Sequence, residues 1–266
     1  MANEGPAAVE PLIACLGEED GQIRDAAAQT LGRLGSAAVQ PLIGCLKDPN
    51  ASVRRSAVLA LGRLGDARAV DPLTACLKDG DEGVRGQTEE ALRDIELKPF
   101  IEKGMRLRAV ADADLDGDGT MDYVVVLERQ EDPNDPDWAD APRPLLILLR
   151  DATGPLKLAK RNDKIVLPRS GGGMWGDPLD GLEAGTKTFT VSHYGGTSWR
   201  WGNSYTFNYS RIDKTWQLVS VDILESVHVI DPDAEAETHE YTPPKDYGKI
   251  DIADFDPDNY LGKGDR

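Results

Sequence analysis

The stretch AVEPLIACL, residues 8–16, returns as AVQPLIGCL at residues 38–46 and as AVDPLTACL at residues 69–77. The three prolines in these copies are separated by 30 and 31 residues. Self-similarity at a nearly fixed step is the signature of a solenoid built from repeated supersecondary units. The sequence therefore predicts an internal repeat that organises the first third of the chain.

Each copy has the features of a helical hairpin. Apolar residues from Val9 to Leu16 recur at the i, i+3, i+4, i+7 spacing of one buried helix face. We place Pro11 and its two counterparts in the first helical turn, where a missing N–H breaks no hydrogen bond. A second, Ala-rich block ends in LGRLG at residues 31–35 and 61–65, and its last glycine can adopt the positive φ that ends a helix. We expect helix, acidic turn, helix and glycine stop in each unit.

This pattern resembles the HEAT-repeat superfamily, in particular the short repeats of the bilin-lyase-like type, over residues 6–96. The resemblance implies an α-solenoid of three hairpins, which is about the minimum number for a stable stack. Some relatives of this short type act on tetrapyrroles, but nothing outside the repeat points to that activity here. A shared fold does not imply a shared function.

The three cysteines, Cys15, Cys45 and Cys76, occupy the same position in each repeat. A metal or redox cluster is one interpretation, but the CxxC spacing and neighbouring histidines of such sites are missing. We therefore interpret the cysteines as small residues on the packed helix face, where free cysteine commonly lies.

One arginine per repeat, Arg24, Arg54 or Arg85, lies near the start of the second helix. We expect each to tie the turn between the two helices to an acidic residue such as Asp20, Asp48 or Asp81. Recognition of an acidic partner by this row is the alternative.

The helical pattern ends before Lys98-Pro99, and strand-like alternation begins at residue 106. Strand-like runs between Gly, Pro and Asp clusters then predict an antiparallel meander, closed or sandwich-like. The fold class is multidomain α and β, a solenoid followed by an antiparallel β-rich domain. The predicted domains are the solenoid at 6–96, a linker at 97–105, the β domain at 106–222 and an acidic, Pro-containing tail at 223–266.

The strongest chemical signal is DADLDGDGTMD at residues 112–122. Its five carboxylates would repel one another strongly if no cation balanced them. Counted from the second aspartate, oxygen-bearing residues fall at positions 1, 3, 5, 7 and 9, with glycine at position 6, which is the spacing of an oxygen cage for Ca²⁺. The predicted ligands are Asp114, Asp116, Asp118, Thr120 and Asp122.

The loop departs from an EF-hand, because position 12 is Val125 where the EF-hand has a bidentate glutamate, and a strand-like run surrounds it. It resembles the Asp-x-Asp-x-Asp-Gly-x-x-Asp loops of FG-GAP and VCBS β-repeats. The resemblance implies a structural Ca²⁺ that staples a turn between strands. A metal-free acidic turn is the alternative.

Two further segments, RSGGGMWGDP at 169–178 and SHYGGTSWRW at 192–201, resemble together with the acidic loop an uncharacterised β domain of bacterial exported proteins and lipoproteins. The resemblance implies a fold and favours the bacterial cell envelope or the extracellular space. A cytoplasmic location stays open, and no activity follows from the resemblance.

The segment 199–209, WRWGNSYTFNY, has an aromatic residue at every odd position except Asn203. Alternation at period two places these rings on one face of a strand. The face is either a wall of the core or a stacking platform for a sugar or peptide.

Charge and composition restrict the function. A net charge of −17 disfavours binding to nucleic acid, and no apolar run is long enough for a membrane span. Ser192, His193 and Asp177 could be drawn as acid–base machinery, but neighbouring strand residues point to opposite faces, which separates Ser192 from His193. We therefore expect no enzyme and assign no catalytic or cofactor-binding residue.

The leading prediction is a calcium-stabilised protein-interaction or scaffold module that binds another protein through the solenoid surface. A carbohydrate- or envelope-binding protein that uses the aromatic strand is the first alternative. A hydrolase that uses His193 is the second.

Overall fold

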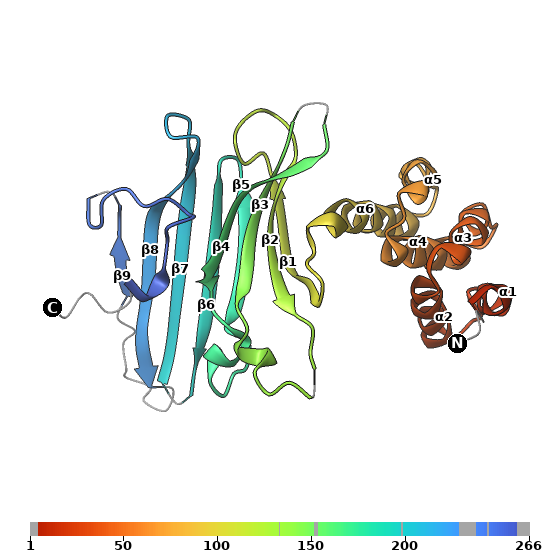
Figure 1. The fold of residues 1–266 in the computed structure, drawn as a ribbon, viewed down its shortest axis with the longest axis horizontal. Coiled ribbons are helices and arrows are strands. Elements are labelled where there is room, and N and C mark those ends of the chain that lie inside the picture. Colours follow the sequence, from red (N-terminus) through yellow and green to blue (C-terminus); the bar gives the residue numbers. More distant parts are fainter. Residues whose placement is uncertain are drawn as a thin grey trace. The chain divides into compact units, whose positions relative to one another are not determined.

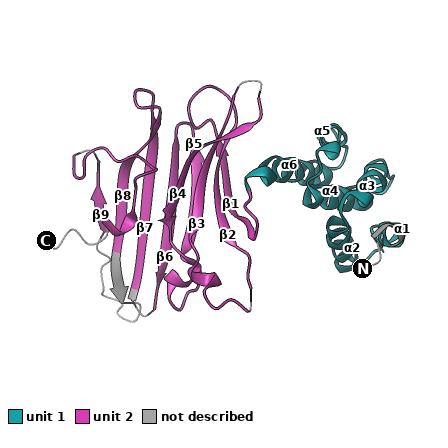
Figure 2. Ribbon diagram, viewed as in Figure 1, with its two compact units in different colours: residues 1–100 teal, residues 101–266 magenta. Residues whose placement is uncertain are grey.

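The structure, a computed structural model, divides into two compact units, residues 1–100 and 101–266 (Figure 2). It describes residues 5–132, 134–151, 154–197, 199–228, 238–243 and 245–259. For residues 5–7, 199 and 225–228 only the backbone is described.

The first unit is built from three helical hairpins (Figure 1). The hairpins are α1 (Gly5–Cys15) with α2 (Gly21–Arg33), α3 (Val39–Cys45) with α4 (Ala51–Leu64), and α5 (Val70–Cys76) with α6 (Glu82–Leu97). Short 3₁₀ turns lie at η1 (Gly35–Ala38), η2 (Ala67–Ala69) and η3 (Lys98–Phe100). The second helices α2, α4 and α6 pack against one another in succession, so the predicted solenoid of three repeats is confirmed.

Local sequence sets the helix ends. The side chains of Asp20, Asn50 and Asp81 accept backbone N–H groups in the first turns of α2, α4 and α6, which satisfies donors that a helix leaves free. The glycine stops are confirmed for the first two repeats, because Gly35 and Gly65 have φ values of 73° and 58°. The expected stop is wrong for the third repeat, where α6 ends at Leu97 and Lys98 keeps a right-handed helical conformation.

The predicted position of the prolines holds for two repeats of the three. Pro41 and Pro72 are the third residues of α3 and α5, but Pro11 lies inside α1, which begins earlier, at Gly5. The 3₁₀ turns η1 and η2 lie directly before α3 and α5, whereas α1 is already α-helical from Gly5, the first described residue.

Each arginine of the row binds backbone carbonyls of its own turn, and Arg54 also binds an acidic side chain. Nη1 of Arg54 donates to the carbonyls of Asp48 (2.9 Å) and Pro49 (3.2 Å), and Arg24 and Arg85 donate to the corresponding carbonyls of their turns. Arg54 also forms a 2.8 Å ion pair with Asp79 of the next repeat. The row therefore ties the start of each second helix to the turn before it.

Close packing of small residues brings the helices of the first unit together. A Cβ on Gly62 of α4 would lie 2.9 Å from the Cβ of Ala91 in α6, closer than carbon atoms approach without strain. Fully buried leucines, among them Leu31, Leu61 and Leu73, fill the rest of this core.

The second unit contains two antiparallel sheets. Sheet A has the order β1 (Met105–Ala113), β2 (Asp122–Arg129), β3 (Arg143–Arg150) and β4 (Leu156–Val166). Sheet B has the order β5 (Leu179–Gly185), β6 (Thr188–Gly196), β7 (Trp199–Ser210), β8 (Thr215–His228) and β9 (Thr238–Tyr241). Three 3₁₀ turns, η4 (Trp138–Asp140), η5 (Arg169–Gly172) and η6 (Pro257–Asn259), complete the unit. Strands that follow one another in the chain are neighbours in each sheet, which confirms the predicted antiparallel meander.

The two sheets lie face to face and share one core (Figure 1). Val126 and Ile147 of sheet A meet the rings of sheet B, where Phe189 and Phe207 stack with centroids 5.1 Å apart. Every second residue of each strand points into this core, as the period of a strand requires.

The sandwich extends beyond the predicted end of the β domain at residue 222. β8 continues to His228, and Ile250, Ile252 and Phe255 are buried in the core although the sequence assigned them to a tail. Ile252 pairs with β8 through its N–H to Trp216 O (2.9 Å), and its carbonyl accepts Asn162 Nδ2 of β4 (2.6 Å). Pairing between distant segments fixes this region, and local composition does not reveal it. Tyr260 and Leu261, the next apolar residues of the predicted tail, lie outside the described residues.

A search of the described helices found none that is both long enough and apolar enough to cross a membrane.

Replacing Phe255 by alanine tests whether the C-terminal segment is part of the sandwich. Phe255 is 1% exposed and packs edge-on against Tyr205, at 5.0 Å between centroids. Deleting a buried phenylalanine ring costs about 3–5 kcal/mol. We expect Phe255→Ala to lower the free energy of unfolding of the second unit by that amount, measured by tryptophan fluorescence in urea. The control Ile212→Ala removes a side chain that is 91% exposed and should change little; an equally small change for Phe255→Ala would contradict the assignment.

Candidate metal centre

The acidic loop connects β1 to β2 and is anchored at both ends. Leu115 is fully buried in the sandwich core, and Asp122 is the first residue of β2. Gly117 and Gly119 have φ values of 82° and 90°, a region that other residues rarely adopt. The alternation of aspartate and glycine thus lets the chain turn tightly while its carboxylates stay together.

Asp122 holds the loop to the sheet. It is fully buried, and its carboxylate accepts the N–H of Leu115 and the N–H of Arg150, both at 2.9 Å. A buried carboxylate is tolerated only when hydrogen bonds replace its water. The two bonds connect the start of β2 with the loop and with the end of β3.

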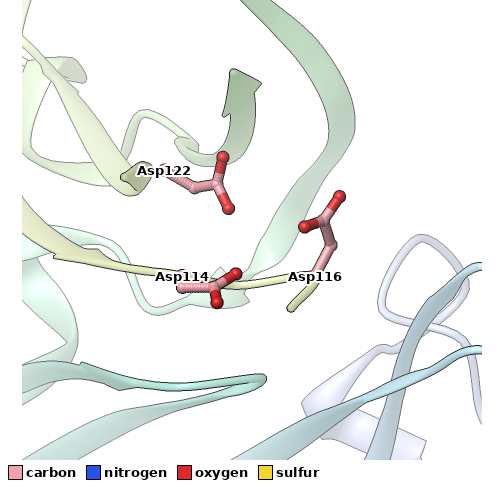
Figure 3. A group of neighbouring side chains, drawn as sticks. All are labelled: Asp114, Asp116 and Asp122. Atoms are coloured by element: carbon pink, nitrogen blue, oxygen red, sulfur yellow. The ribbon is translucent and has the colours of Figure 1, made fainter. Parts of the chain in front are cut away.

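Three of the five predicted ligands are brought together. Asp114, Asp116 and Asp122 each offer a carboxylate oxygen, and these oxygens lie within 4.8 Å of one another. Figure 3 shows the three side chains arranged around a common space. Asp114 is positioned by the N–H groups of Gly117 (2.7 Å) and Gly119 (3.2 Å).

The side chain of Asp118 does not join this group, and Thr120, which was predicted to contribute its backbone carbonyl, directs its hydroxyl to Asp118. Asp118 Oδ1 accepts the backbone N–H of Thr120 at 2.7 Å, and the Thr120 hydroxyl lies 2.6 Å from the same oxygen. That hydroxyl also donates to the carbonyl of Arg150 at 2.9 Å. The two side chains stabilise the turn, because aspartate and threonine readily bond to backbone two residues away.

The electrostatics of the centre favour a bound cation. Burial raises the pKa of Asp116, and the charges of Asp118 and Asp114 raise it further. Burial and the neighbouring carboxylates also raise the pKa of Asp122, whereas hydrogen bonds from Thr120 lower the pKa of Asp118.

A hard divalent cation with oxygen ligands fits this donor set, and Ca²⁺ is the cation that such flexible carboxylate loops commonly take. Asp114, Asp116 and Asp122 would hold it, and its charge would balance theirs. Calcium binding itself stays a prediction.

Two residues that the sequence analysis missed connect the loop to sheet B. The N–H of Lys187 donates to the carbonyl of Asp114 (2.9 Å), and the carbonyl of Lys187 accepts the N–H of Tyr209 in β7 (2.8 Å). Lys187 has a φ of 64°, and its side chain crosses Gly117, where a Cβ would lie 1.9 Å from Lys187 Cε. The sequence feature that could have pointed to Lys187 is the turn-like segment GTKT at residues 185–188, which lies between two strand-like runs. The acidic loop is therefore part of a link between the two sheets.

The cysteines fit the packing interpretation. Cys76 is 7% exposed and its Sγ lies 3.5 Å from the carbonyl of Pro72, while Cys15 and Cys45 are half-buried. Burial raises the pKa values of the Cys45 and Cys76 thiols, which disfavours the reactive thiolate. Among the described residues, the group with metal-ligand spacing contains aspartates and no cysteine.

The structure does not bring Ser192, His193 and Asp177 together as the acid–base site of a hydrolase. His193 is 2% exposed, its Nε2 accepts the N–H of Leu167 (3.3 Å), and burial together with the charge of Arg143 lowers its pKa to about 4. The Ser192 hydroxyl pairs with that of Ser204 at 2.9 Å, on the opposite face of the sheet.

Asp177, the third residue of the hydrolase alternative, belongs to a buried network of ion pairs. Its carboxylate forms two hydrogen bonds with Arg143, at 2.6 and 2.7 Å, and one with Arg108 at 2.9 Å. Arg143 also donates to Glu128 at 2.8 Å, and its side chain is 2% exposed. This network joins sheet A to the segment that leads into β5.

The aromatic strand is a core wall in its described middle part. Tyr205 and Phe207 are 1% and 0% exposed, and both pack on Phe255. Trp201 is half-buried, and the side chain of Trp199 lies outside the described residues. The rings of Tyr205 and Phe207 therefore offer no platform for a sugar.

Comparisons with known proteins agree with the fold of the first unit. The family model for HEAT repeats matches residues 9–93. Two crystal structures of engineered proteins match 36% of the chain at 22% identity, with a TM-score of 0.24 for each. The matched region spans 50% of one of these chains and 30% of the other, and they carry no functional argument. The comparison with curated proteins found no match.

The chain is therefore a two-unit protein in which a HEAT-repeat region is followed by a pair of antiparallel sheets. HEAT repeats favour a scaffold that mediates protein interaction.

The pH dependence of stability tests the buried network. Burial alone would raise the pKa of Asp177, but hydrogen bonds from Arg143 and Arg108 lower it below its usual range. A carboxyl group whose pKa is lower in the folded than in the unfolded state stabilises the fold. This stabilisation is complete above the unfolded pKa of about 3.9 and is lost as the pH falls through the folded pKa. We expect Asp177→Asn to destabilise the second unit by about 3 kcal/mol at pH 7, because it leaves a buried arginine without its full counter-charge.

The difference between wild type and Asp177→Asn should shrink progressively below about pH 4, where the carboxyl of the unfolded wild-type chain takes up a proton while the folded carboxyl is still ionised. Urea unfolding followed by tryptophan fluorescence at several pH values measures it. The exposed Asp254→Asn is the control. A destabilisation by Asp177→Asn that stays constant down to pH 2 would argue against the ion network.

Proposed function

We propose that this protein is a calcium-stabilised, non-enzymatic interaction module whose HEAT-repeat region holds a partner protein. The observation that carries the proposal is the stack of repeats, because such stacks present a continuous surface on which partners bind. The separation of Ser192 from His193 supports the non-enzymatic part.

A hollow on the second helices suggests where the partner binds. It has a volume of about 350 Å³ and crosses all three repeats, from α2 through α4 to α6. Its lining residues are Asp25, Arg55, Ser56, Leu59, Gly83 and Gln87. We name it the HEAT groove.

The residues that line the HEAT groove indicate which chemical groups a partner needs in order to bind there. Asp25 and Arg55 place opposite charges along it, and Gln87 adds an amide that both donates and accepts hydrogen bonds. Gly83 leaves space beside the Arg55 guanidinium, which lies 3.5 Å from where a Cβ would be. A polar segment of a protein with charges of both signs complements this lining.

The cation has a structural role in this proposal. The loop lies between two strands, so no pair of helices is present to open on binding, as in calcium sensors. The carbonyl of Asp114 instead accepts a hydrogen bond from the N–H of Lys187, and the carbonyl of Lys187 accepts the N–H of Tyr209 in sheet B. Binding would neutralise the clustered carboxylates and hold this link between the sheets in place.

Thermal melting in the presence and absence of calcium tests the structural role. All five tryptophans lie in the second unit, so their fluorescence reports its unfolding, while circular dichroism at 222 nm reports mainly the helices. A ligand at 100 times its dissociation constant stabilises the folded state by about 2.7 kcal/mol. For a domain of this size we expect the fluorescence midpoint to rise by about 5–10 °C, with the helical signal nearly unchanged.

Asp116→Ala should abolish this rise, whereas the exposed Asp254→Ala should keep it. Metal analysis of the purified protein accompanies the melts. Equal midpoints with calcium and with chelator, in protein that contains no metal, would overturn the calcium proposal.

Site-directed crosslinking tests the HEAT groove. A photo-crosslinking residue in place of Gln87 captures the partner in cells that make the protein, and binding is then measured with both purified proteins. We expect Arg55→Glu to weaken binding about tenfold or more, as arginines at the centre of an interface often do.

The matched control is Lys47→Glu, the same charge reversal on an exposed residue just after α3, outside the groove. It should leave the affinity unchanged. A partner that binds the Arg55→Glu and wild-type proteins equally well would place the contact elsewhere.

A further inference from the structure

The outer face of sheet B contains a second groove. It has a volume of about 510 Å³ and is lined by residues of β6, β7, β8 and β9 together with Asp180 of β5. Val191, Tyr205 and Val221 point into the core, so their neighbours one position along each strand point outward. We name this hollow the sheet B groove.

Strand register places its polar side chains in one row. Ser192 pairs with Ser204, Ser204 with Asp222, and Asp222 with Glu240. The two serine hydroxyls lie 2.9 Å apart. Neighbouring strands are about 4.8 Å apart, so the row extends about 14 Å across the sheet. That length suits several residues of an extended peptide.

The basic residues that line the groove are two histidines, His193 and His239, beside three carboxylates. Asp222 and Glu240 are directly opposite on neighbouring strands, an arrangement of like charges that destabilises a sheet. Asp180 adds a third carboxylate, and no lysine or arginine is among the residues that line the groove. A cationic ligand would remove this repulsion.

An apolar wall borders the charged row. Tyr194, which is 39% exposed, and Leu224 lie on either side of Gly202, each 3.6 Å from where a Cβ would be. The glycine keeps the floor between them shallow. Aliphatic stems of lysine and arginine pack on such surfaces, and a tyrosine ring also attracts their charge.

We propose that the sheet B groove binds a basic segment of a partner protein, with lysine or arginine side chains that reach Asp222, Glu240 and Asp180. The stems lie between Tyr194 and Leu224, and the serine hydroxyls accept further hydrogen bonds. The site is separate from the HEAT groove and from the acidic loop, so it does not depend on the function proposed above.

Binding of a fluorescein-labelled hexalysine peptide to the full-length protein tests this site. Fluorescence anisotropy at low salt should show saturable binding, with a hexaglutamate peptide as the negative probe. The double variant Asp222→Asn, Glu240→Gln should weaken binding at least about tenfold, because it removes two carboxylates of the groove.

Two controls separate the groove from general attraction to an acidic protein. Asp254→Asn with Glu131→Gln changes the net charge equally at exposed positions outside the groove and should leave the affinity within about twofold. Ser204→Leu changes no charge but fills the middle of the row and should also weaken binding about tenfold. Tryptophan fluorescence melts verify that each variant is folded.

The proposal is overturned if hexalysine does not bind the wild-type protein, if the exposed double variant weakens binding as much as the groove variant, or if Ser204→Leu binds normally while folded. A chitosan oligosaccharide is tested in parallel. Preferential binding of that amino sugar, with no binding of the peptide, would assign the groove to carbohydrate and also overturn it.

Discussion

An α-helical hairpin or a β-sheet with one apolar face must cover that face with another layer, and both units of this protein are arranged around that constraint. In the first unit, each hairpin covers its neighbour, and Gly62 lets α4 approach α6 closely enough for their small residues to touch. In the second unit, the sheets cover each other. The segment that carries Ile252 and Phe255 fills the space between β4 and β8.

Buried carboxylates of this protein have two kinds of hydrogen-bond partner, arginine side chains and backbone N–H groups. Asp177 and Glu128 have an arginine between them, Arg143, which forms hydrogen bonds with both. Asp122 is held by backbone N–H groups and lies beside Asp114 and Asp116, so three carboxylates share one small space. The first arrangement is balanced by arginine within the protein. For the second, we propose that a cation from solution provides the balance.

The two proposed binding surfaces differ in chemistry because they arise from different architectures. The HEAT groove forms where the second helices of stacked repeats lie side by side, and it is lined by one acidic and one basic residue, Asp25 and Arg55. The sheet B groove forms where the outward positions of neighbouring strands meet in register, and its lining includes three carboxylates and no lysine or arginine. A scaffold with both surfaces could hold a polar partner on one unit and a basic partner on the other.

Features that depend on neighbours in the chain could be predicted from the sequence alone. The repeat, the glycine stops at Gly35 and Gly65, and the convergence of Asp114, Asp116 and Asp122 all follow from spacing within a few residues. The structure decided features that depend on pairing over long distances. Lys187 meets the acidic loop, and Phe255 enters the core, because strands about 70 and about 50 residues away pass beside them, and only the register of the folded sheets brings such segments together.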